Sequence, residues 1–319
     1  MVGFGHKSVF VRLIVVFCVL ELCSGKLVKE EPLVLKYHNG PLLTASPTLD
    51  VNLIWYGKFS PVQRSIVGDF VMSLGGLFRG NSLKTSVSTW WKTTESYKAA
   101  SNGGKAYPVK TRTRLGRQKL DEFYSLGKSL KRTDIAVLVE RAIASRALPA
   151  SPNAVYLVLT SADVTVERFC MSSCGFHASN VKGKPAFPYA WVGNSETQCP
   201  GQCAWPFHQP LYGPQTPPLV PPNGDVGIDG MIINIATVLA GAVTNPFNTG
   251  YFQGDASAPL EAVSACPGMY GTGAYPGFPG NLLVDKTTGA SFNAHGANGR
   301  MFLLPAIWDP ATFSCKTLV

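Results

Sequence analysis

The sequence predicts a mixed α/β or α+β fold, organised as a single disulfide-stabilised domain with a mixed sheet. Residues 154–160 (AVYLVLT) form a continuous apolar run of strand length, which is typical of a central strand covered on both faces. Residues 231–243 form a second apolar run, about 13 residues long, which has the length of an ordinary buried helix. An even number of cysteines follows the N-terminal segment, which favours a disulfide-bonded domain.

The N-terminus has the pattern of a secretory signal peptide. Lys7 and Arg12 precede the apolar run 13–20, and the small residues Ser24 and Gly25 follow it. The alternative, a membrane anchor, needs about 20 apolar residues, and Glu21 interrupts the run too early. We therefore expect residues 1–25 to be removed and residues 26–319 to form one exported domain without a membrane span.

Cysteine usage agrees with an oxidising compartment. Six cysteines remain in the mature chain, namely Cys170, Cys174, Cys199, Cys203, Cys266 and Cys315. The two Cys-x3-Cys units are expected to pair with each other, which leaves Cys266 for Cys315. A zinc site is the competing interpretation, because the spacing of Cys170, Cys174 and His177 resembles a set of metal ligands.

Composition excludes a disordered chain and gives a first indication of partners. Hydrophobic residues make up 45% of the chain and charged residues 15%, which is enough for a large core. The net charge is +9, and removing Lys7, Arg12 and Glu21 leaves +8. In an exported protein this charge favours acidic polysaccharides or anionic surfaces, and no nucleic-acid-binding motif is present. Nine basic residues lie within 105–132, a run that is usually a solvated face.

The first half of the chain alternates strand and helix signals. Residues 33–37 and 49–56 are rich in strand-forming residues. Ser60, Pro61 and Gln63 then predict a helix start with a capping box, and that helix ends before Gly75. A second helix is expected from Thr133 or Asp134 through Ala147, ahead of the apolar strand 154–160.

The second half of the chain is organised around the apolar run 231–243. Asn245-Pro246 ends this helix, because proline has no N–H to donate and restricts the residue before it. Asp225 and Asp229 are expected just before the helix, where carboxylates are favourable. Residues 212–223 hold five prolines and form a stiff exposed segment, and residues 300–307 form a late β-like run.

Several long motifs resemble one plant family. They are Tyr37-His38-Asn39-Gly40-Pro41-Leu42-Leu43, Val51-Asn52-Leu53-Ile54-Trp55-Tyr56-Gly57, Tyr189-Ala190-Trp191-Val192-Gly193-Asn194, Cys199-Pro200-Gly201 with Cys203-Ala204-Trp205-Pro206, and Ala274-Tyr275-Pro276-Gly277. From about residue 35 to the end, the chain resembles the Exordium-like, or phosphate-induced, protein family. The resemblance implies secretion to the apoplast and a part in growth control linked to brassinosteroid and carbon status. It brings no established reaction and no catalytic residues.

A degenerate zincin-like scaffold is a further interpretation of the fold. In some secreted metalloproteases a His-Glu-x-x-His helix runs into Thr-Asp-Pro, which is similar to Thr244-Asn245-Pro246. This alignment places Thr237, Val238 and Gly241 at the ligand and base positions, and none of them can bind zinc or move a proton. We therefore expect no metal or other cofactor.

Two sets of residues are candidates for a site. His177, Asp225 and Glu261 are the candidates for a polar site, and their convergence would favour a hydrolase. Aromatic side chains are candidates for stacking on sugar rings. The main candidates are Trp191, Trp205 and Tyr275, and the further candidates are Tyr189, Tyr270 and Phe278. Asp163 follows the apolar strand, where ligands often bind, although a turn-capping role is the simpler interpretation.

The preferred function is binding in the cell wall space without catalysis, with a cell-wall polysaccharide or a cell-surface receptor as partner. The alternative is a secreted hydrolase or an inactive relative of a zincin-like metalloprotease. No catalytic residue can be assigned from the sequence.

Overall fold

The computed structural model describes residues 32–76, 84–98, 111–181 and 186–319. The chain divides into two compact units, residues 1–33 and 34–319, and the fold below is that of the second unit. Residues 1–25, the expected signal peptide, lie outside the described residues, so their removal stays a prediction.

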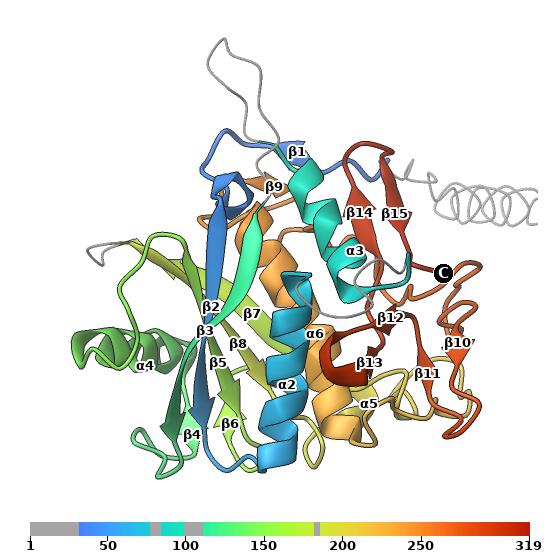
Figure 1. Ribbon diagram of the computed structural model, residues 1–319, viewed down its shortest axis with the longest axis horizontal. Coiled ribbons are helices and arrows are strands. Elements are labelled where there is room, and N and C mark those ends of the chain that lie inside the picture. The colour runs from blue at the N-terminus through green and yellow to red at the C-terminus, as the bar shows by residue number, and fades with distance from the viewer. Residues whose placement is uncertain (1–31, 77–83, 99–110, 182–185) are drawn as a thin grey trace, which may run out of the picture. The chain divides into compact units, whose positions relative to one another are not determined.

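A five-stranded mixed sheet forms the centre of the fold, in the order β3-β2-β5-β8-β7 (Figure 1). Its strands are β2 (Thr48–Tyr56), β3 (Arg112–Asp121), β5 (Ala154–Thr160), β7 (Gly175–Asn180) and β8 (Phe187–Gly193). The first four strands in the sheet order run parallel, and β7 pairs antiparallel with β8. The prediction of an α/β fold with a mixed sheet is therefore confirmed.

Helices cover both faces of this sheet. The helices α2 (Pro61–Leu74) and α6 (Val226–Thr244) contact each other and the same face, whereas α4 (Arg132–Ala144) contacts β5 and β8 from the other face (Figure 1). Alternate residues of a strand point to opposite faces, so Tyr156 and Val158 join the core beneath α4. All seven residues of β5 are buried, which explains the continuous apolar run.

The predicted start of α2 is confirmed in detail. The backbone N of Gln63 donates to Oγ of Ser60 at 3.1 Å, and the backbone N of Ser60 donates to Oε1 of Gln63 at 3.0 Å. Helix α4 is shorter than expected, because Arg146 adopts a positive φ of 60° two residues beyond Ala144.

Helix α6 is longer than the sequence indicated. It begins at Val226, so Asp229 lies inside its first turn and is buried, contrary to the expectation that Asp229 precedes the helix. The next residue, Gly230, packs closely against Ala204 and the carbonyl of Cys203, which leaves no room for a Cβ. With 19 residues, α6 is long and apolar enough to cross a membrane, but most of it is buried in the core.

Short elements complete the second unit, and most lie in its C-terminal third. The expected strand 33–37 is reduced to β1, and the run 300–307 is divided between β13 and the start of β14. The bounds are β1 Lys36–Tyr37, η1 Leu43–Ala45, α3 Val87–Trp91, η2 Lys92–Ser96, β4 Ser129–Leu130, β6 Thr165–Val166, α5 Pro200–Cys203, β9 Tyr251–Phe252, β10 Leu283–Val284, β11 Ser291–Phe292, β12 Ala294–His295, η3 Ala297–Gly299, β13 Met301–Phe302, β14 Ile307–Asp309 and β15 Ser314–Lys316.

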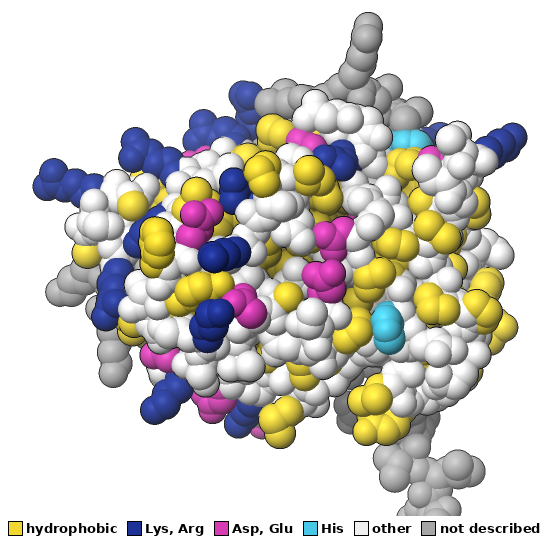
Figure 2. Space-filling model, turned by 90° about the horizontal axis from the view of Figure 1, so that it is seen from below, with side chains coloured by type: hydrophobic (Ala, Val, Ile, Leu, Met, Phe, Trp, Pro, Cys, Tyr) yellow, Lys and Arg dark blue, Asp and Glu magenta, His cyan; other side chains and the backbone are white. Residues whose placement is uncertain are grey.

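The basic run lies partly on β3, at one edge of the sheet. Arg112, Arg114 and Arg117 are exposed there, and Arg114 forms an ion pair with Asp50 at 2.8 Å. On the face in Figure 2, most Lys and Arg side chains lie on the left half, and the right half carries mainly hydrophobic and uncharged side chains. On this face, basic charge is thus concentrated away from the side on which Figure 1 places the C-terminal hairpins.

Substitution of Gly230 tests the close packing of α6, and substitution of Gly68 in α2 is the control. A Cβ at Gly230 would lie 2.7 Å from Cβ of Ala204, whereas a Cβ at Gly68 in α2 would lie 3.7 Å from its nearest neighbour, Leu115. We expect Gly230→Ala to lower the free energy of unfolding by about 1–3 kcal/mol through overpacking. Gly68→Ala should raise it by about 0.5–1 kcal/mol, because alanine favours the helix. Urea denaturation measures both, and equal effects would contradict the packing argument.

Candidate functional site

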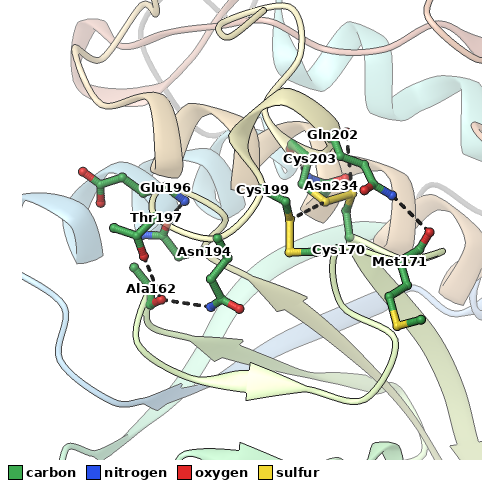
Figure 3. The surroundings of a disulfide bond; sticks show 12 residues. Ala162, Cys170, Met171, Asn194, Glu196, Thr197, Cys199, Gln202, Cys203 and Asn234 are labelled. Atoms are coloured by element: carbon green, nitrogen blue, oxygen red, sulfur yellow. Dashed lines mark hydrogen bonds between the residues drawn. A yellow bond between two sulfur atoms is a disulfide. The ribbon is translucent and has the colours of Figure 1, made fainter. Parts of the chain in front are cut away.

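Three disulfides join Cys170 to Cys199, Cys174 to Cys203 and Cys266 to Cys315. The two Cys-x3-Cys units pair with each other, as the sequence predicted. Figure 3 shows the first bond beside Cys203, with Gln202 donating to the carbonyl of Met171 and Asn234 donating to that of Cys203. The zinc interpretation is not supported, because the sulfurs of Cys170 and Cys174 are bonded to other cysteines.

An aromatic groove lies next to the disulfides. The ring of Trp205, two residues after Cys203, packs on Tyr270 with ring centroids 5.6 Å apart. A tight turn at Tyr275-Pro276-Gly277-Phe278 forms another part of the groove, with hydrogen bonds in both directions between Tyr275 and Phe278. Gly277 has a φ of 88°, which the residue after proline in a type II turn requires.

The proline-rich segment forms the facing wall of the aromatic groove. Gly277 packs against the ring of Pro214, where a Cβ would lie only 2.7 Å away. The groove has a volume of about 660 Å³, and its lining includes Trp205, Tyr212 and Tyr275. Tyr212 and Tyr275 are 83% and 65% exposed, so their rings are available to a ligand. Tyr212 is not among the residues predicted from the sequence, although an aromatic residue inside a stiff proline-rich segment is a usable signal.

The expectation that Trp191 stacks on a sugar is wrong. Its side chain is fully buried in β8, where it packs edge-to-face on Phe169 with ring centroids 5.2 Å apart and donates to Oγ1 of Thr160 at 3.0 Å. Tyr189 and Tyr270 are buried as well. Trp205 and Tyr275 do line the groove, and their binding role stays a prediction.

A buried polar cluster joins two of the three predicted polar residues. Nε2 of His177, on β7, donates to Oε2 of Glu261 at 2.7 Å, and their side chains are only 8% and 12% exposed. Nδ2 of Asn245 donates to the other carboxylate oxygen at 2.7 Å. Gly241 of α6 makes the cluster possible, because a Cβ there would lie 2.7 Å from Nε2 of His177.

Asp225 does not belong to this cluster, so that part of the polar-site prediction is wrong. Asp225 caps the start of α6, where its Oδ1 accepts from the backbone N of Ile228 at 2.9 Å, and Oδ2 accepts from Nε2 of Gln63 at 3.0 Å. Asn245, which belongs to the cluster, follows the other end of the same helix. A helix-capping role accounts for Asp225.

Asp229 is a buried carboxyl group inside the first turn of α6. The backbone N and Nδ2 of Asn223 donate to it at 2.8 and 2.7 Å. Burial raises the pKa of Asp229 to about 7, against the opposing effect of these two donors. Asp229 therefore titrates near neutrality in the folded protein.

The positions aligned with the His-Glu-x-x-His helix carry either apolar side chains or a hydroxyl that already has a hydrogen-bond partner in the same helix. Oγ1 of Thr237 donates to the carbonyl of Ile233 in the same helix, and Val238 is buried against Gly175. Within the described part of the chain, no group of three His, Cys, Asp or Glu side chains is placed to hold a metal ion.

Asp163 lies at the end of β5 and has its own partners. Nζ of Lys128 and the hydroxyl of Tyr124 donate to Oδ2 at 2.6 and 2.8 Å, and Ser161 donates to Oδ1 at 2.6 Å. Although partial burial opposes ionisation, these donors together hold the pKa of Asp163 well below its usual range. Both carboxylate oxygens of Asp163 therefore have hydrogen-bond partners within the protein, as a structural role at the end of β5 requires.

The fold and the groove define a disulfide-braced α/β protein with an aromatic surface site. A family model described as "Phosphate-induced protein 1 conserved region" matches residues 35–318. The chain therefore belongs to the Exordium-like, or phosphate-induced, protein family, as the motifs indicated.

Named plant relatives cover nearly the whole chain. Identity is 56% over 308 residues with Protein EXORDIUM-like 2 of Arabidopsis thaliana, covering 95% of each chain. It is 53% over 323 residues with Protein PHOSPHATE-INDUCED 1 of Nicotiana tabacum, covering 98% of this chain and 99% of that one. Protein EXORDIUM of Arabidopsis thaliana is 55% identical over 311 residues, covering 94% of this chain and 95% of that one. No solved structure matches significantly.

The buried cluster predicts a stability effect at Glu261. Glu261→Ala removes the acceptor of both His177 and Asn245, and we expect it to lower the free energy of unfolding by about 1–3 kcal/mol. Glu122→Ala, which removes an ion pair with Arg64 at 3.6 Å on the surface, is the control and should cost less than about 1 kcal/mol. Chemical denaturation compares the two, and equal losses would contradict the assignment of a buried cluster.

Asp229 predicts a pH dependence of stability. Because its pKa rises from 3.8 to about 7 on folding, the folded state binds the extra proton, and the resulting stability is fully present below about pH 4 and lost as pH rises to about 7. Asp229→Asn should remove a slope of up to about 1.4 kcal/mol per pH unit over this range. Urea denaturation across the range checks this, with the exposed Asp255→Asn as a control that keeps the slope.

Proposed function

We propose that the protein is secreted to the apoplast and binds a cell-wall polysaccharide through the aromatic groove, without catalysing a reaction. The observation that carries this proposal is the groove itself, in which exposed tyrosine rings flank Trp205. Aromatic faces stack on the apolar faces of sugar rings, and few other surface features offer this contact.

Secretion is supported by the predicted signal peptide and by the three disulfides, which persist in oxidising compartments. The family resemblance links such a protein to growth control associated with brassinosteroid and carbon status. In this proposal, binding in the wall is the molecular basis of that role.

A hydrolase is the second candidate function, and the hydrogen bond between His177 and Glu261 favours it. These two groups are an acid–base pair in chemical type. However, both side chains are largely covered, and neither lines the aromatic groove. The positions aligned with a zincin-like centre also lack metal ligands, so the binding proposal has the stronger support.

The proposal predicts a loss of carbohydrate binding in Tyr275→Ala. Phe313 is a matched control, because it is also 65% exposed and does not line the groove. We expect Tyr275→Ala to weaken binding of wall oligosaccharides about tenfold, equivalent to about 1.4 kcal/mol, and Phe313→Ala to leave it unchanged. Titration calorimetry with the mature protein measures both affinities.

Equal affinities for the two variants would contradict the assignment of the groove. Hydrolysis of the oligosaccharides by the wild-type protein, abolished in Glu261→Gln, would instead establish the second candidate function.

A further inference from the structure

We infer that the aromatic groove is the middle part of a longer trough, and that this trough binds a neutral, linear polysaccharide along several consecutive sugar units. This inference rests on the proposed function and specifies the class of ligand.

Two further hollows adjoin the aromatic groove. A hollow of about 290 Å³ shares Trp205 and Gly277 with the groove and extends towards Val284. A hollow of about 470 Å³ shares Pro210 and Tyr212 with the groove and extends towards Met171. Shared lining residues place the three hollows side by side, so we treat them as one trough.

An aromatic side chain lies at each boundary between the hollows. Tyr212 belongs to one boundary and Trp205 to the other, while Tyr275 lines the middle. A linear chain that crosses the trough would therefore meet three aromatic rings in succession. A monosaccharide would use only part of this surface.

The trough lacks the charges that an acidic polysaccharide requires. None of the described residues that line the three hollows is Lys, Arg, Asp or Glu. Among these residues, His208 is the one side chain that becomes positively charged when it binds a proton. A uronic acid carboxylate would lose water there without gaining an ionic partner, which is unfavourable. The acidic partner that net charge suggested is therefore disfavoured at this site, and the exposed arginines of β3 lie elsewhere.

Uncharged polar groups along the trough suit sugar hydroxyls. Among the described residues, the hydroxyls of Tyr212 and Tyr275 and the side-chain amide of Asn281 make no hydrogen bond. His208 is exposed, and its Nδ1 donates to the carbonyl of Gln209, so its Nε2 can accept a hydrogen bond. Each group can donate to or accept from a hydroxyl without a change of charge.

The trough is held rigid before any ligand binds. Trp205 follows Cys203 of the Cys174–Cys203 bond, and Pro267 follows Cys266 of the Cys266–Cys315 bond. The turn at Pro276-Gly277 packs on Pro214, which belongs to the proline-rich segment. A rigid surface loses little conformational entropy on binding, which favours an extended ligand that makes many weak contacts.

The test uses oligosaccharides of increasing length with the mature, disulfide-bonded protein. The neutral series consists of β-1,4-linked gluco-, xylo- and manno-oligosaccharides from disaccharide to hexasaccharide, and oligogalacturonides of the same lengths form the acidic series. We expect affinity for a neutral series to rise at least about tenfold with length and to be insensitive to salt, and the acidic series to bind more weakly.

Tyr212→Ala tests the continuity of the trough. Because Tyr212 lies at a boundary between hollows, this variant should reduce the affinity for the hexasaccharide more than that for the disaccharide. Phe123→Ala is the control, since Phe123 is 94% exposed and lies outside the trough, and it should bind like the wild type. Thermal denaturation of each variant confirms that the fold is retained.

The remaining outcomes separate the inference from the proposed function. Equal affinity for disaccharide and hexasaccharide would overturn the extended trough but leave carbohydrate binding in place. Tighter, salt-sensitive binding of oligogalacturonides would overturn the neutral ligand. Failure to bind any carbohydrate, including the case in which a proline-rich peptide binds instead, would overturn the proposed function and the inference together.

Discussion

The close approach of the α6 backbone to its neighbours is the constraint on which both candidate sites depend. Gly230 allows α6 to contact Ala204, directly before Trp205 of the groove. Gly241 lies three turns further along the same helix face and allows the contact with His177 and Glu261. The Cys174–Cys203 bond then connects the chain just before β7 to the end of α5, so the two sites share one framework.

Local signals in the sequence were sufficient for much of this framework. The capping box of α2 depends on residues that are three positions apart, and β5 is recognisable because every one of its side chains is buried. The pairing of the cysteines followed from their equal spacing in two units. Each of these features depends on residues that are close in sequence, or on the number and spacing of the cysteines.

The failures concern contacts between residues far apart in sequence. The sequence predicts a surface position for Trp191, but helices that are distant in sequence cover both faces of β8, and all seven of its residues are buried. Residue type alone groups Asp225 with His177 and Glu261, although the nineteen residues of α6 separate it from Asn245. The hydrogen bond between His177 and Glu261 joins residues 84 apart in sequence, and the sequence predicts the two residues but not the close packing of Gly241 against them. Long-range packing decided these cases.

The basic edge of the sheet has a consequence for contacts between copies of the protein. Among the described strands, β3 is an edge, and an edge strand offers unpaired backbone groups to another chain. The exposed Arg112, Arg114 and Arg117 would bring like charges together if the β3 strands of two copies approached each other. Such repulsion hinders intermolecular strand pairing, so the charges on β3 help to prevent fibril growth.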